Sequence, residues 1–175
     1  MKPANTKSLI KDFSHLYRNC REGSRSSMLY GFAVGDGWYQ ILYELSAQID
    51  EQARSMGIKP GDERYPSADQ VKEKFGGLRF YMMCPDHKTY EDLIRAATSK
   101  ALHTCEHCGR PGKMIDDGWY SVRCERCHGR KEEIWAEQSA AWKASENAGG
   151  YRAPINEAFA EVDAEAARKK EDENK

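Results

Sequence analysis

The chain has 175 residues, of which 39% are hydrophobic and 31% are charged, and its formal net charge at pH 7 is −1. This length suits one domain of ordinary size, or a core that carries an appended module. The composition is normal for a soluble globular protein. No apolar run is long enough to span a bilayer, and the N-terminal residues lack the apolar stretch of a secretory signal. We therefore expect a cytoplasmic protein without a membrane partner.

A net charge of −1 excludes a strong overall attraction to nucleic acid, but the charge is distributed unevenly along the chain. Residues 100–131 contain seven Lys or Arg against four Asp or Glu, whereas residues 132–175 contain six against eleven. A basic excess of this size is mild, so it gives only weak support for a nucleic-acid contact near residues 100–131.

Two helices are predicted in the N-terminal third, because apolar residues recur at helical spacing over residues 6–20 and over residues 38–55. Between them, residues 28–34 form a short apolar run that fits a buried strand or the wall of a pocket. Gly35-Asp36-Gly37 then breaks the chain before the second helix. Asp-Gly-Trp-Tyr occurs at residues 36–39 and again at 117–120. Because the flanking residues differ, we attribute both copies to shared turn chemistry rather than to a repeat.

A β-hairpin is predicted at residues 70–83, with Gly76-Gly77 as a two-residue turn. This register places Phe75 opposite Leu78 on an apolar face. The other face carries cations and an aromatic ring that suit contacts to phosphates and bases. Its candidate contacts are Lys72, Lys74, Arg79 and Tyr81. The alternative is an ordinary solvated face, which half-exposed antiparallel strands often present.

Glu73 does not fit this hairpin, because the register places its carboxylate among apolar side chains. Three explanations remain open: the register is wrong, Glu73 lies at the sheet margin, or Glu73 is functional.

A helix at about residues 89–103 leads directly into the strongest motif, Cys105-Glu-His-Cys108 and Cys124-Glu-Arg-Cys127. Two C-x-x-C pairs direct four sulfur atoms to one point, and this donor set is typical of one structural Zn²⁺. In a reducing cytoplasm such pairs indicate metal ligands rather than disulfides. His107 and His128 are alternative ligands, although four thiols are already available. Cys20 and Cys84 are expected to be ordinary packed thiols.

The order of elements around the cysteines is that of a treble-clef zinc finger. Lys113–Asp116 and residues 119–123 are strand signals around the turn residues Asp117-Gly118, and a helix follows Cys127 and ends near Gly149-Gly150. The basic residues expected at the surface of this module are Arg110, Lys113, Arg123, Arg126, Arg130 and Lys131. A short helix from about residue 155 and a frayed charged tail complete the chain.

These elements predict an α+β fold with a small antiparallel sheet, flanking helices and an integral four-cysteine zinc module. We expect a core at residues 1–103, the zinc module at residues 104–147, and a C-terminal helix with its tail at residues 148–175.

Cys124-Glu-Arg-Cys127-His128-Gly-Arg-Lys131 resembles the end of the HNH endonuclease motif. That family implies a histidine on the first strand of the hairpin, which activates water beside a catalytic metal ion. Residues 114–117 read Met-Ile-Asp-Asp and contain no histidine, so the resemblance implies a scaffold without the general base.

Val71-Lys-Glu-Lys-Phe-Gly-Gly-Leu-Arg-Phe-Tyr81, together with the paired C-x-x-C motifs, is similar to small uncharacterised zinc-binding proteins of bacteria and their phages. The resemblance covers roughly residues 35–128. It implies a shared fold and a bacterial or phage origin, in the latter case in the host cytoplasm, and it implies no activity.

The resulting functional hypothesis is a non-enzymatic, zinc-stabilised binding protein. Its partner is a nucleic acid or a nucleic-acid-processing protein, as expected for a bacterial or phage accessory factor. Two alternatives remain: a diverged nuclease or other hydrolase that uses Glu73 with Asp36, His87 or His128, and a small-molecule-binding protein.

Overall fold

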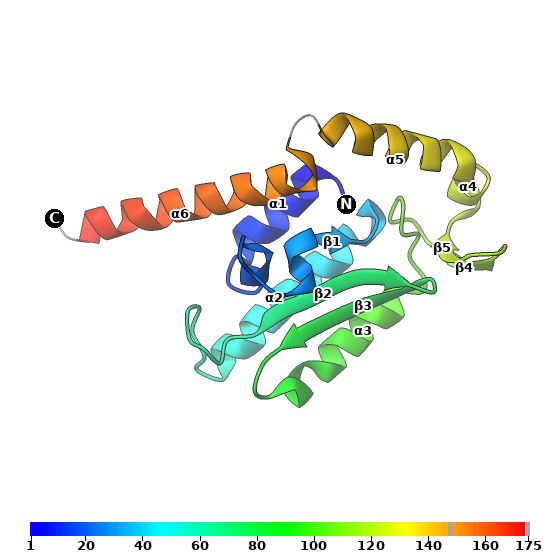
Figure 1. Cartoon of the computed structure of the whole chain (residues 1–175). Helices are drawn as coiled ribbons and strands as arrows, with labels where there is room; N and C mark the ends of the chain where they lie inside the picture. Colours follow the sequence, from blue (N-terminus) through cyan, green and yellow to red (C-terminus); the bar gives the residue numbers. More distant parts are fainter. Residues whose placement is uncertain (147–148, 174–175) are drawn as a thin grey trace.

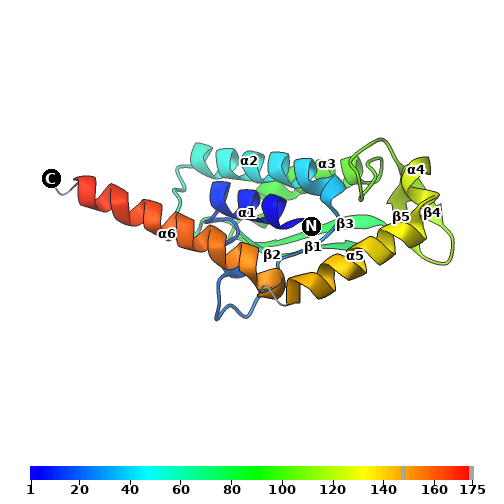
Figure 2. The same ribbon diagram turned by 90° about the horizontal axis from the view of Figure 1, so that it is seen from above.

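A three-stranded sheet covered by helices forms the centre of the fold (Figure 1). The computed structural model describes residues 1–146 and 149–173. Figures 1 and 2 show α2 and α3 on one face of the sheet, and apolar side chains of the strands are buried there. The elements of this part are α1 (Pro3–Asp12), β1 (Phe32–Ala33), α2 (Tyr39–Ser55), β2 (Ser67–Lys74), β3 (Gly77–Met83) and α3 (Glu91–Ala101).

The sheet is mixed, which corrects the prediction of an antiparallel sheet. β2 and β3 form the predicted antiparallel hairpin, but β1 pairs with β2 in parallel, with Phe32 opposite Val71. A parallel pair needs a long crossover connection, and α2 lies in the segment that joins β1 to β2. The apolar run at residues 28–34 contains this short strand. The place of the strand at the edge of the sheet depends on tertiary contacts, which the run itself does not predict.

The first helix is shorter than predicted, whereas the second is confirmed as α2. α1 ends at Asp12, and the chain then passes through turns into a 3₁₀ helix at Arg18–Cys20. The apolar positions are nevertheless buried. The Tyr17 hydroxyl bonds the Ser46 hydroxyl at 2.7 Å, and the Arg18 guanidinium donates to the Tyr65 carbonyl at 2.8 Å. These long-range bonds favour turns over a longer helix.

The turn of the β2–β3 hairpin is Phe75-Gly76, not Gly76-Gly77. Lys74 pairs with Gly77, and both turn residues have positive φ, +54° and +73°. This is the conformation of a type I′ turn. Phe75 is 67% exposed instead of lying on the apolar face. Glu73 keeps its place on the inner face but at the strand end, where its carboxylate accepts the N–H of Gly76.

Phe75 is the one non-glycine residue with positive φ in the described part of the chain. Such a conformation costs an ordinary L-residue about 1 kcal/mol, whereas asparagine tolerates it. We therefore expect Phe75→Asn to raise the free energy of unfolding by about 0.5–1 kcal/mol in urea titrations. Phe75→Ala keeps the strain and loses the ring, so it is the control that should not stabilise the protein. A destabilising Phe75→Asn would contradict this account.

The C-terminal elements extend from the cysteines back across the core (Figure 1). The predicted second hairpin is confirmed. The elements are β4 (Lys113–Asp116), β5 (Tyr120–Arg123), α4 (Glu125–His128), α5 (Lys131–Glu146) and α6 (Ala153–Glu173). The expected boundary between residues 147 and 148, and the chain end at 174–175, lie outside the described residues. None of the helices described is both long and apolar enough to cross a bilayer.

α6 is longer than the short helix predicted, because it continues through the charged segment to Glu173. Its first half packs on α1 (Figure 1). Lys7 and Lys11 each form an ion pair with Glu161, at 2.5 and 2.6 Å. Hydrogen bonds from Lys11 and Lys7 lower the pKa of Glu161 to about 2. The acidic face of this helix is thus partly neutralised within the chain.

Candidate metal centre and basic face

The first C-x-x-C pair lies on a tight loop after α3. The N–H of Cys105 donates to the Arg110 carbonyl at 2.7 Å, and the N–H of Gly109 donates to the Cys105 carbonyl at 2.8 Å. Gly109 has a φ of +76°, which glycine adopts at little cost. These bonds fold the chain back, so that the sulfur atoms of Cys105 and Cys108 both face the second pair.

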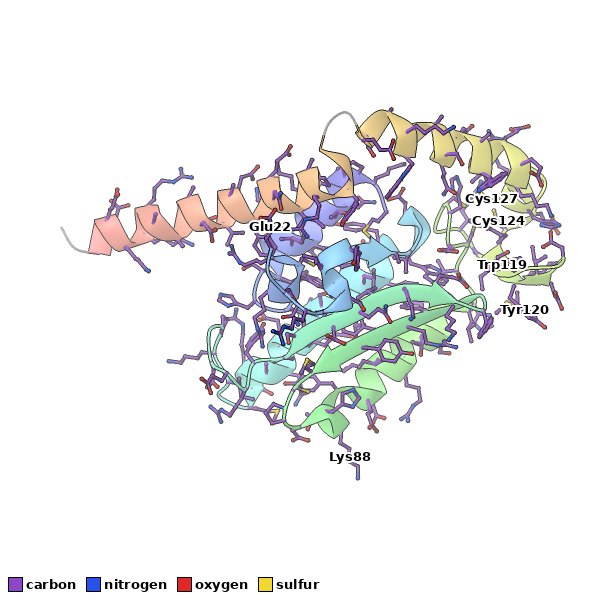
Figure 3. All side chains as sticks on the ribbon, in the orientation of Figure 1. Glu22, Lys88, Trp119, Tyr120, Cys124 and Cys127 are labelled. Carbon is purple, nitrogen blue, oxygen red and sulfur yellow. The ribbon has the colours of Figure 1, made fainter. Side chains whose placement is uncertain are left out.

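The second pair is positioned by the β4–β5 hairpin and the start of α4. Cys124 precedes the first residue of α4 and Cys127 lies within it (Figure 3). The four Sγ atoms lie within 4.8 Å of one another, and Cys108 Sγ is 3.7 Å from Cys124 Sγ. A Zn–S bond of about 2.3 Å places the sulfur atoms of a tetrahedron about 3.8 Å apart. The cluster therefore fits a tetrahedrally bound metal ion.

The chemistry of the thiols also favours a bound cation. Burial and the neighbouring sulfur atoms raise the pKa of Cys127 to about 12. A thiolate at this position therefore needs a positive charge beside it. At Cys108, burial acts in the same direction, but hydrogen bonds from the side chain and N–H of Arg110 outweigh it and lower the pKa to about 6. A divalent cation would offset two of the four negative charges and so favour the thiolate forms.

The loop at Gly35–Trp38 docks directly on the first C-x-x-C loop. The N–H of Gly35 donates to Glu106 Oε1 at 2.9 Å, and the N–H of Gly37 donates to the Glu106 carbonyl at 2.7 Å. A Cβ atom on Gly37 would lie 2.0 Å from the carbonyl oxygen of Cys105. A Cβ atom on Gly35 would lie 2.3 Å from the carbonyl oxygen of Glu106. Only glycine allows two backbones to approach this closely.

This contact makes the cysteine module (residues 104–130) an integral part of the core. The buried Trp38 indole donates to the Thr104 carbonyl at 2.8 Å, and Val122 of β5 belongs to the main hydrophobic core. It also corrects the account of the two Asp-Gly-Trp-Tyr copies. Gly118 is a turn glycine with a φ of +95° and open space around it, whereas Gly37 is required by steric contact.

The predicted basic contacts of the cysteine module divide into two groups. Three of them form ion pairs with acidic side chains of the protein and are therefore neutralised in place. These pairs are Arg123 with Glu106 (4.0 Å), Arg130 with Glu133 (2.6 Å) and Lys131 with Asp117 (2.6 Å).

The other three, Arg110, Lys113 and Arg126, have no carboxylate partner among residues 1–146 and 149–173. Together with Arg123 they line a shallow cleft of about 470 Å³. Glu125 is the only acidic residue in its lining. The lining of this cleft is therefore strongly basic.

The four hairpin residues also lie together, on the outer face of β2 and β3. Lys72 is directly opposite Arg79, and the Lys72 ammonium lies 5.8 Å from the ring centroid of Tyr81. Within the described chain, neither Lys72, Lys74 nor Arg79 has a carboxylate partner. Like charges directly opposite each other on two strands are destabilising in isolation. We call Lys72, Lys74, Arg79 and Tyr81 the basic face.

Sequence reasoning missed the aromatic residues that border this face. Phe75 is exposed at the hairpin tip, and Trp119 is 74% exposed beside the half-exposed Tyr120 (Figure 3). The hairpin tip meets the cysteine module, because the Met114 thioether lies over Gly76. The signal available for Trp119 was its position immediately after Gly118, in a turn between two short strands. Side chains at such a turn have little core to enter.

The carboxylates considered for catalysis come together only in part. Glu73 and Asp36 line one cavity with Glu106, which the sequence did not identify, but His87 and His128 do not line it. Burial raises the pKa of Glu106, while the N–H of Gly35 and the charge of Arg123 oppose this shift. Among the described residues, the four cysteines are the only group of His, Cys, Asp or Glu close enough to hold a metal ion.

The chain was compared with models of protein families, with curated proteins and with solved structures, and none of them matched. Its chemistry must therefore be inferred from its own residues.

Proposed function

We propose that this protein binds single-stranded nucleic acid without cleaving it, through the basic face and the aromatic residues next to it. In this proposal the cysteine module is a treble-clef finger with one structural Zn²⁺. A four-thiolate zinc site leaves no coordination position for water. The metal would therefore stabilise the fold and would not activate a water molecule for hydrolysis.

The observation that carries this proposal is the clustering of cations without carboxylate partners. A second group of such cations, Arg110, Lys113 and Arg126, lines the cleft of the cysteine module, whereas Arg25, Lys59, Lys88 and Lys143 lie singly on separate loops or helices. The basic face instead holds three of them on one hairpin, with Lys72 and Arg79 in direct cross-strand register. Phosphate groups bound there would remove the repulsion that the free protein carries.

Single strands are favoured over a duplex because of the exposed rings. Phe75 is exposed at the tip of the β2–β3 hairpin, Trp119 and Tyr120 are exposed on the neighbouring β4–β5 hairpin, and Tyr81 lies farther along the basic face, opposite Gln70. Bases stack on such rings only when they are free of their own duplex partners. Phe75 also holds a strained conformation while exposed, which is the kind of outlier that functional sites retain.

Salt dependence tests the electrostatic part of this proposal. In fluorescence anisotropy with a labelled oligothymidine, the affinity of the wild-type protein should fall steeply as salt is added. Lys72→Glu should weaken binding by about tenfold and reduce the slope of log K against log salt by about 0.7. The same variant should be slightly more stable, by roughly 0.5 kcal/mol, because the introduced carboxylate would pair with Arg79 across the strands.

The matched control is Lys59→Glu, which changes the net charge equally on an exposed loop away from the basic face. Equal losses in the two variants would mean that only the overall charge matters. The absence of salt-dependent binding would remove nucleic acid and leave a protein partner for the basic face.

Stacking is tested on the same oligonucleotide with Phe75→Asn and Trp119→Ala. Each should lower the affinity by about 1–2 kcal/mol, and neither should affect binding to a duplex as strongly. Trp135→Ala is the control, because Trp135 is also exposed but lies on α5. Unchanged affinity in both test variants would contradict base stacking.

A further inference from the structure

A second binding region lies between α5 and the core. Here a cleft of about 700 Å³ is bounded on one side by α5 and on the other by the N-terminal segment, β1 and the cysteine module. All residues from Tyr30 through Asp36 line it, so the cleft runs along the whole of β1. We call it the α5 cleft.

One end of the α5 cleft is acidic. Its lining contains the carboxylates of Asp36, Glu73, Glu106 and Glu137, against three cations, which are Lys2, Arg123 and the N-terminal ammonium of Met1. Most of these carboxylates have partners within the protein. Glu73 is the exception, because its only described bond is from the N–H of Gly76 and no cation pairs with it in the described chain. A cationic group of a ligand would fill this position.

The other end is aromatic. Tyr30, Trp142 and Tyr151 line it; the Trp142 and Tyr151 rings are nearly parallel, at 7°, with centroids 6.2 Å apart. Tyr30 and Trp142 are mostly exposed, and Tyr30 lies 6.2 Å from Tyr151. Exposed rings of this kind bind apolar or cationic side chains.

The wall between these two ends is a free sheet edge. β1 is the outer strand of the order β1-β2-β3 and, among the described residues, pairs only with β2. An edge strand presents backbone N–H and C=O groups to an incoming extended chain, which can add to the sheet as a further strand. The N–H groups of the flanking Gly31 and Gly35 are already bonded within the chain, to the Met28 carbonyl at 2.8 Å and to Glu106 Oε1 at 2.9 Å, so an added strand would pair with β1 itself.

We propose that the α5 cleft binds an extended, basic segment of a partner protein by strand addition to β1. A Lys or Arg of that segment pairs with Glu73, and an apolar or aromatic side chain packs against Tyr30, Trp142 and Tyr151. The negative lining disfavours phosphates, so this site is separate from the basic face. It does not depend on nucleic-acid binding.

The experiment is a display selection of random short peptides on the full-length, metal-loaded protein. Enriched peptides should combine Lys or Arg with apolar residues. Glu73→Gln, which keeps the side-chain shape, should weaken the selected peptides by about tenfold or more, since it removes a charged hydrogen-bond acceptor. Trp142→Ala should weaken them at the aromatic end. Amide exchange should become slower at residues 30–36 when a selected peptide is added.

Matched controls lie outside the cleft: Glu63→Gln on an exposed loop, and Trp135→Ala on the same helix as Trp142. Both should bind the selected peptides like the wild-type protein. The proposal is overturned if no peptide is enriched, or if enriched peptides bind Glu73→Gln and Trp142→Ala normally. If N-methylation of the peptide backbone leaves affinity unchanged, strand addition is wrong.

Discussion

Replacement of Cys105 by serine is expected to remove the bound zinc ion and to lower the melting temperature by more than about 10 °C. The physical reason is that the proposed metal would join the two C-x-x-C segments through four bonds, whereas the backbone bond from the Glu106 N–H to the Val122 carbonyl is a single hydrogen bond between them. Binding of structural zinc by four ligands supplies about 10–16 kcal/mol in small finger peptides. A loss of even about 4 kcal/mol shifts the melting temperature of a chain this long by roughly 8–16 °C.

The loss should extend beyond the cysteine module itself. Val122 belongs to the main core, and Trp38 donates its indole N–H to the Thr104 carbonyl. When the module loosens, both contacts are lost together with the docking of Gly35 and Gly37. We therefore expect one broadened or less cooperative unfolding transition, rather than local melting alone.

Elemental analysis and differential scanning calorimetry measure this effect. The wild-type protein should contain one zinc ion per chain, and a chelator strong enough to remove it should reproduce the unfolding seen for Cys105→Ser. Cys84→Ser is the matched control, because Cys84 is a half-buried thiol outside the cluster. A wild-type protein that is fully stable without metal, or a Cys105→Ser variant that retains it, would contradict a structural zinc site.

The second large effect is expected for Gly37→Ala, which should destabilise the protein by at least about 3 kcal/mol. The added methyl group would lie 2.0 Å from the Cys105 carbonyl oxygen and 2.5 Å from the Gly109 nitrogen. Both atoms belong to backbone held by the first C-x-x-C loop, so neither can move aside as a flexible side chain would. The docked loop must therefore separate from the cysteine module.

Urea titration monitored by tryptophan fluorescence suits this variant, because Trp38 is buried beside the contact. Gly129→Ala provides the control. Gly129 has a helical φ of −64°, and a Cβ atom there would meet its nearest neighbour at an ordinary 3.5 Å. That control should be neutral or slightly stabilising, by about 0.5 kcal/mol. A Gly37→Ala variant as stable as Gly129→Ala would show that the two backbones do not pack as described.

Local sequence rules predicted the elements whose cause lies within a few residues. The two C-x-x-C pairs, the β4–β5 hairpin around Asp117-Gly118 and the helix over residues 38–55 depend on spacing, turn chemistry and periodicity. These rules gave a wrong result where two neighbouring positions were about equally suited to a turn. Gly76-Gly77 and Phe75-Gly76 both permit a two-residue turn, and the register chosen moves Phe75 from the core face to the surface.

By itself, the sequence determined that four thiols form one cluster suited to a metal ion and that an α+β core adjoins it. Only the tertiary structure decided which charges remain available for a partner. Arg123, Arg130 and Lys131 form ion pairs within the protein. Lys72 and Arg79 instead lie opposite each other, and neither has a carboxylate partner in the described part of the chain. Ion pairing depends on distances between residues far apart in the chain, and no local pattern records those distances. No local pattern records the contact of Gly37 either. Only glycine fits at this position, because the backbone of Cys105, about seventy residues away in the chain, packs against it.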